Sequence, residues 1–162
     1  MRTDLVQITE GGLPNRPSMV SCPDALYGAI LDLEDPFLPA FMRNRGYPPA
    51  IKVMAETALA ELLPLAAPVS ETAVHLWLAP LVAATANPRG MDSVEGWLNA
   101  MVLAMAGEPI GAFTVETQRR ALREMKFWPT PADVWEIVKH DARDIRRRIE
   151  NLKIIAGIED WK

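Results

Sequence analysis

The chain of 162 residues has one cysteine, Cys22, and two histidines, and these shortages exclude several kinds of site. A single cysteine cannot form a disulfide within the chain, which is typical of a protein from a reducing compartment. With no cysteine pair and so few histidines, a structural zinc site is not expected. We therefore predict that the protein holds no metal and no cofactor.

Patterns of catalytic residues are also missing. No serine lies in a glycine-flanked nucleophile elbow, and no glycine-rich loop is followed by Lys-Ser or Lys-Thr, which excludes a P-loop nucleotide hydrolase. The carboxylates of Asp32, Glu34 and Asp35 stand at a helix end before a proline, where we expect solvent rather than the cleft that acid–base catalysis needs. His140 and Asp144 share a helix face, but no further ligands lie at suitable spacing. The sequence therefore predicts a protein that is not an enzyme.

No apolar run is long enough to cross a membrane. The first residues, Met1 to Asp4, do not begin the apolar segment of a signal peptide. The most apolar stretch, residues 73–86, is too short for a bilayer and is interrupted by Pro80. These observations predict a cytoplasmic protein without a membrane partner.

What the sequence does contain favours helices. Apolar residues make up 49% of the chain, with abundant Ala, Leu and Met and only scattered β-branched residues. Apolar positions recur at spacings of three and four, and no segment alternates with a period of two. We predict an all-α fold, a compact single-domain bundle of five to six helices with a long C-terminal helix. Helices are expected at 24–33, 49–63, from Ser70 past Pro80, at 92–106, from Thr114 and over 131–156.

Boundaries of the expected segments come from capping and helix-breaking residues. Residues 1–23 are rich in Gly, Pro and small polar residues and predict a flexible or extended leader. The helical domain then spans 24–156, and 157–162 form a tail. Ser70, Thr114 and Thr130 are predicted N-caps. Trp77 and Trp97 fall on apolar stripes and are predicted to lie in the core.

Charge is distributed unevenly. The formal net charge is −4, and residues 1–115 carry a balance of −6. Residues 116–153 carry ten Lys or Arg and seven Asp or Glu, a balance of +3. A basic C-terminal part on an acidic body favours an anionic partner for that part, and an ordinary solvated helix face explains the same pattern.

The most informative stretch is the junction from Lys126 to Trp135, which joins two of the expected helices through a Pro-Thr-Pro turn. Phe127 and Trp128 are adjacent and cannot both point the same way, so we expect one to pack inward and the other to be partly exposed. Packing of both in the core is the alternative. Aromatic residues beside arginines are common anchors at protein interfaces. The predicted partner-binding surface consists of Arg119, Arg123, Lys126, Trp128, Arg143 and Arg147.

Residues 70–138 resemble the bacteriophage replicative helicase loader/inhibitor proteins. The resemblance rests on the Trp-bearing helix Glu71–Trp77, a second helix, and a basic helix that ends in Lys126–Val134 with the sequence KFWPTPADV. It implies a small, helical, non-enzymatic partner of a hexameric DnaB-type helicase, which holds the helicase inactive and delivers it to an initiator. The shared motif would comprise Phe127, Trp128, Pro129, Thr130, Ala132 and Asp133.

Two alternatives remain at this stage. The basic helices on either side of the Thr130-Pro131 turn also suggest a small DNA-binding regulator that uses 116–153, with the second helix in a major groove. A phage inhibitor of a host defence complex would likewise be a compact, charged non-enzyme.

Overall fold

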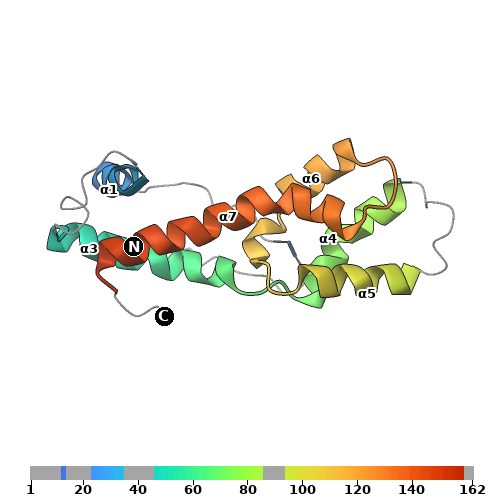
Figure 1. Ribbon diagram of the computed structural model, residues 1–162, viewed down its shortest axis with the longest axis horizontal. Helices are drawn as coiled ribbons and strands as arrows, with labels where there is room; N and C mark the ends of the chain where they lie inside the picture. The colour runs from blue at the N-terminus through green and yellow to red at the C-terminus, as the bar shows by residue number, and fades with distance from the viewer. Residues whose placement is uncertain (1–11, 14–22, 35–45, 86–93, 159–162) are drawn as a thin grey trace. The chain divides into compact units, whose positions relative to one another are not determined.

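The computed structural model describes residues 12–13, 23–34, 46–85 and 94–158, and the fold is all-α (Figure 1). Six α-helices lie within these residues, and two short 3-10 helices accompany them. The α-helices are α1 (Asp24–Glu34), α3 (Pro49–Leu62), α4 (Glu71–Ala84), α5 (Val94–Met105), α6 (Val115–Glu124) and α7 (Pro131–Ala156). The 3-10 helices are η1 (Leu63–Ala66) and η2 (Ile110–Ala112). The predicted fold class and the long C-terminal helix over 131–156 are confirmed.

Some sequence predictions fall on residues outside the described ranges. These are most of the leader 1–23, including Cys22, and the residues at 159–162 of the predicted tail. The region around Pro36 and the first residues of the helix expected at 92–106 also lie outside them. The predicted division into leader, helical domain and tail stays a prediction.

Contacts between residues divide the chain into two compact units. The first unit holds the described residues of Met1–Pro17 and Leu65–Ile145, and the second holds those of Ser18–Pro64 and Arg146–Lys162. Helices α4, α5 and α6 belong wholly to the first unit, α1 and α3 belong to the second, and α7 contributes residues to each.

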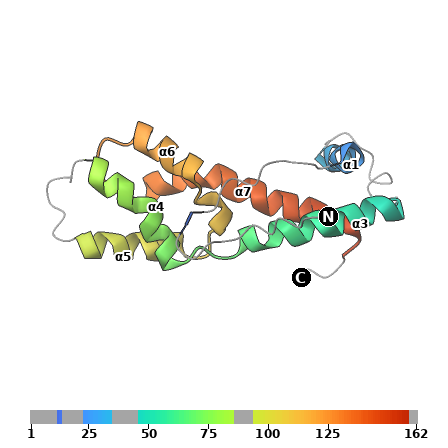
Figure 2. The same ribbon diagram turned by 180° about the vertical axis from the view of Figure 1, so that it is seen from behind.

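In the first unit, α4 contacts both α5 and α6, and the two views show it between them (Figure 2). Most residues of α4 are apolar, and the helix buries Ala73, Val74, Trp77, Leu78 and Leu81. Trp77 is fully buried and meets the ring of Phe113 edge to face, with 5.9 Å between centroids. Edge-to-face aromatic pairs add stabilisation beyond the area that they bury. The predicted core positions of Trp77 and Trp97 are confirmed.

Gln118 compensates for the proline inside α4. Pro80 has no backbone N–H, so the carbonyl of Leu76 four residues earlier loses its helical donor. The side-chain amide of Gln118 on α6 donates to that carbonyl at 3.2 Å and to the carbonyl of Trp77 at 2.9 Å. The helix therefore continues through Pro80 because a neighbouring helix replaces the missing donor.

The start of α6 is fixed by a buried pair of threonines. Thr114 is the N-cap, and it forms a reciprocal capping box with Thr117 in which each side chain accepts from the other's backbone amide. The Thr117 hydroxyl also accepts from the indole Nε1 of Trp77 at 3.1 Å, and it lies 2.9 Å from the carbonyl oxygen of Ala112. The predicted caps Ser70 and Thr114 are confirmed.

Two close backbone approaches complete the first unit. Pro68 and Pro109 form an isolated antiparallel bridge, flanked by hydrogen bonds from Val69 N to Glu108 O and from Ile110 N to Ala67 O. Gly111 lies in η2 where a Cβ atom would stand 2.8 Å from Cδ1 of Ile145 and 2.9 Å from Cβ of Leu65. The residue at 111 therefore has to be glycine for the segment to pack this closely.

The second unit has its own small core. Leu26 and Ala29 of α1, Ala55 and Leu59 of α3, and Leu152, Ile155 and Ala156 of α7 are buried together. Helix α7 ends in a Schellman motif, in which Gly157 adopts φ +75° and the amide of Ile158 donates to the carbonyl of Lys153. Burial raises the pKa of the Tyr47 phenol above its usual value, and the nearby carboxylate of Asp32 raises it further.

Candidate interaction site at the junction of α6 and α7

The junction between α6 and α7 is held from behind by Trp97 of α5. The indole Nε1 of Trp97 donates to the carbonyl oxygen of Pro129 at 2.8 Å, and this hydrogen bond is buried. The ring of Trp97 also lies against that of Trp128, with 5.2 Å between centroids. The turn is thus attached to the core by a hydrogen bond and an aromatic contact on the same side chain.

The first turn of α7 is capped by its own side chains. The carboxylate of Asp133 accepts from the backbone amide of Thr130 at 2.8 Å and from its hydroxyl at 2.7 Å. The Thr130 hydroxyl in turn accepts from the amide of Asp133 at 3.3 Å. This reciprocal arrangement fixes where the helix begins, and it confirms Thr130 as the N-cap.

A hydrogen bond ties α6 to α7 behind the junction. The Arg120 guanidinium donates to the backbone carbonyl of Ile137, while Arg120 itself is half-buried. Together with the contacts of Trp97, this bond restrains the junction at both ends. The short connection of Met125 to Thr130 therefore presents its side chains from a fixed backbone.

The two adjacent aromatic residues of the junction point to opposite environments. Trp128 is 9% exposed and packs into the core of the first unit, whereas Phe127 is 59% exposed. The expectation that one packs inward and the other reaches solvent is confirmed. The exposed aromatic residue is Phe127, and the buried side chain of its neighbour Trp128 anchors this part of the turn in the core.

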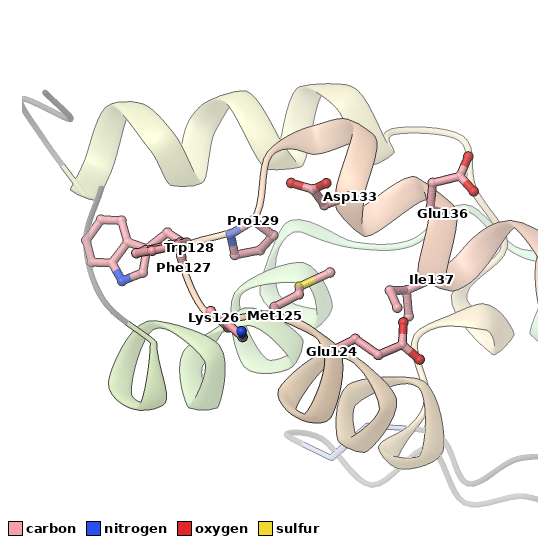
Figure 3. Close-up of a pocket in the computed structure, with 9 residues that line it drawn as sticks. All are labelled: Glu124, Met125, Lys126, Phe127, Trp128, Pro129, Asp133, Glu136 and Ile137. Carbon is pink, nitrogen blue, oxygen red and sulfur yellow. The ribbon is translucent and has the colours of Figure 1, made fainter. Parts of the chain in front are cut away.

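A pocket of about 330 Å³ opens beside Phe127 (Figure 3). Its lining comes from the end of α6, the junction and the first two turns of α7. The lining residues are Glu124, Met125, Lys126, Phe127, Trp128, Pro129, Asp133, Glu136 and Ile137. The volume lies at the lower end of the range for ligand pockets, roughly 300–1,000 Å³, and suits a single side chain better than a large cofactor.

Acidic side chains outnumber basic ones around this pocket. Its lining includes the carboxylates of Glu124, Asp133 and Glu136 and one ammonium group, that of Lys126. Glu136 forms an ion pair with Lys139, and Asp133 is engaged in the helix cap. Within the described residues, Glu124 has neither a hydrogen bond nor an ion pair, and it is exposed at the end of α6.

Only two of the six residues predicted for a partner-binding surface line the pocket, namely Lys126 and Trp128. Arg119 and Arg123 are exposed on α6, where the Nε of Arg123 donates to the carbonyl of Arg119. Arg143 is exposed on the part of α7 that belongs to the first unit. Arg147 is exposed on α7 in the second unit. A common surface for all six stays a prediction.

Sequence reasoning missed the acidic lining and gave Phe127 no place in the binding surface. The opposite orientations of neighbours in an extended segment indicate that one aromatic residue is exposed, but they do not indicate which. That choice depends on Trp97, which is distant in sequence and draws Trp128 inward. From the sequence, Glu124 and Glu136 are ordinary solvent-exposed helix residues. Only the fold shows that they line one pocket.

Two buried nitrogen atoms have no hydrogen-bond partner in the described part of the chain, Nε2 of His75 and Nε1 of Trp128. No group of three or more His, Cys, Asp or Glu residues that could hold a metal occurs in that part either. A helix long and apolar enough to cross a membrane is likewise not found among residues 12–13, 23–34, 46–85 and 94–158.

Comparison of the chain with models of known protein families, with curated proteins and with solved structures finds no match.

Proposed function

We propose that this protein acts by binding another protein through the junction of α6 and α7, without catalysing a reaction itself. The observation that carries the proposal is the exposure of Phe127 on a turn that Trp97 holds by a hydrogen bond and a ring contact. Aromatic residues dominate the binding energy of many protein interfaces, most of all where little conformational freedom is lost on binding.

The surroundings of Phe127 support an interface rather than a solvated turn. A large apolar side chain with 59% of its surface exposed gains free energy when a partner covers it. Charged residues of both signs line the pocket beside it, namely Lys126, Glu124 and Glu136, and Arg123 precedes it by four positions in the sequence. A polar rim around an aromatic centre is the usual arrangement of a specific protein interface.

The partner class that we propose is a hexameric DnaB-type replicative helicase, on the strength of the resemblance over 70–138. Phe127 belongs to the stretch that carries the resemblance. Trp128, Pro129, Thr130 and Asp133 set the turn that exposes it. The mixed charge of the junction supports a protein partner more than DNA, because Glu124, Asp133 and Glu136 would repel phosphates.

The test is affinity capture with the tagged full chain, followed by mass spectrometry and an assay of helicase ATP hydrolysis. We expect a DnaB-type helicase to be captured, and its ATP hydrolysis to change when the purified chain is added. If a different protein is captured and its capture depends on Phe127, the helicase is refuted as the partner, while the proposed interface at Phe127 is kept. Retention of DNA with a steep dependence on salt, and of no protein, would favour the DNA-binding alternative.

A further inference from the structure

We infer that the pocket beside Phe127 receives a basic side chain, an arginine, from the partner protein. This inference rests on the proposed function and names the chemistry that the binding surface recognises. It is carried by three features of one cavity, which are its size, its exposed aromatic wall and the sign of its charged lining.

The size of the cavity limits its occupant. A volume of about 330 Å³ between the end of α6 and the first two turns of α7 is enough for one extended side chain. Nucleotide and redox cofactors fill larger sites, in which most of the ligand surface is covered. The occupant is therefore best supplied by a partner whose main chain stays outside the pocket.

The charge of the lining selects a cation. Three carboxylates and one ammonium group line the cavity, and the carboxylate of Glu136 is already paired with Lys139. Glu124 has no ion-pair or hydrogen-bond partner in the described residues. Oδ2 of Asp133 accepts both bonds of the helix cap, so its other oxygen, Oδ1, has no hydrogen bond within the described residues. A guanidinium group, with five donors in a planar fork, can bond more than one carboxylate oxygen at once, which suits this lining better than an ammonium group does.

The aromatic wall favours the same occupant. Phe127 is largely exposed and is itself part of the lining, so its ring is available to a side chain that enters the cavity. Cations are attracted to the faces of aromatic rings, and arginine makes this contact more often than lysine. The apolar stem of arginine would lie against Met125 and Ile137, which also line the cavity.

The experiment uses the full chain and three small probes, N-acetyl-arginine amide, its neutral isostere N-acetyl-citrulline amide, and N-acetyl-lysine amide. Binding is followed by two-dimensional NMR of the labelled backbone amides. We expect arginine amide to shift resonances of residues 124–129 and 133–137 with saturation, and citrulline amide to bind at least tenfold more weakly. Equal binding of arginine and citrulline amides, or shifts confined to other residues, would overturn the inference.

Two variants assign the effect to the pocket. Glu124→Gln removes a carboxylate at the C-terminal end of α6, where a negative charge does not favour the helix, so folding is not at risk. We expect it to weaken arginine amide binding about tenfold, while Glu116→Gln, which makes the same change in charge outside the pocket, leaves it unchanged. Equal effects of the two variants would show a general charge effect and refute the pocket.

These outcomes are separate from those of the proposed function. If arginine amide binds but no protein is captured through Phe127, the preference of the pocket for arginine is kept and the proposed protein interface is refuted. Capture that depends on Phe127, with no preference for arginine amide over citrulline amide, would keep the interface and refute this inference.

Discussion

The side-chain amide of Gln118 donates to the carbonyl oxygen of Leu76, the acceptor that Pro80 leaves without a helical donor. This contact joins α4 to α6 at the point where α4 would otherwise lose a backbone hydrogen bond. Because α6 leads directly into the junction, the placement of the candidate site depends on how α6 is held against α4.

Replacement of Gln118 by Met should lower the free energy of unfolding by about 1 kcal/mol, because the Leu76 carbonyl loses its donor while the size of the side chain is kept. In a Pro80→Ala background the amide of residue 80 can donate to the same carbonyl. The same replacement should therefore cost less than half as much there. Chemical denaturation of the four proteins of this cycle measures the difference, and equal costs in both backgrounds would disprove the compensation.

Gly111→Ala should destabilise the protein by about 1–3 kcal/mol, because the added Cβ would meet Ile145 and Leu65 at distances below 3.0 Å. The matched control is Gly28→Ala inside α1, where nothing lies within 4 Å of the added atom. That change should stabilise its helix by roughly 0.5–1 kcal/mol. A lower melting temperature for Gly111→Ala and a higher one for Gly28→Ala would support the close approach at 111. A Gly111→Ala variant with the parental melting temperature would argue against it.

Trp97→Phe tests the hydrogen bond that holds the junction. The variant keeps an aromatic ring near Trp128 but leaves the buried carbonyl of Pro129 without its donor, which should cost about 1–2 kcal/mol. Trp97→Ala removes the ring as well and should cost about 3–5 kcal/mol. Denaturant midpoints distinguish the two, and a Phe variant as stable as the parent would mean that the hydrogen bond contributes nothing.

Exposed arginines of the first unit should matter for binding and not for folding. Combined Arg119→Gln, Arg123→Gln and Arg143→Gln changes should alter stability by less than about 1 kcal/mol, since exposed charges contribute little. If the predicted basic surface is correct, the triple variant binds the captured partner more weakly than the parent at low salt. Unchanged binding at every salt concentration would limit the interface to the surroundings of Phe127.

The helices and their caps could be predicted from the sequence because they depend on local rules. Thr114 and Thr130 begin helices through bonds that reach three residues along the chain, and α7 keeps its apolar spacing to its end. The pocket could not be predicted, because it forms between the end of α6 and the first turns of α7, where Glu124 and Glu136 of different helices line one cavity. Nor could the orientation of Trp128, which is decided by a ring contact with Trp97 from 31 positions earlier in the sequence.

The most direct test of the central claim compares Phe127→Ser with Leu103→Ser in quantitative affinity capture. Both residues are exposed apolar side chains of the first unit, and Leu103, at 80% exposure on α5, is the more exposed of the two. Our account predicts that the Phe127 variant melts like the parent yet captures less than a tenth of the partner, while the Leu103 variant captures the parental amount. Full capture by the Phe127 variant, or an equal loss in both, would contradict the claim that the junction of α6 and α7 is the binding site.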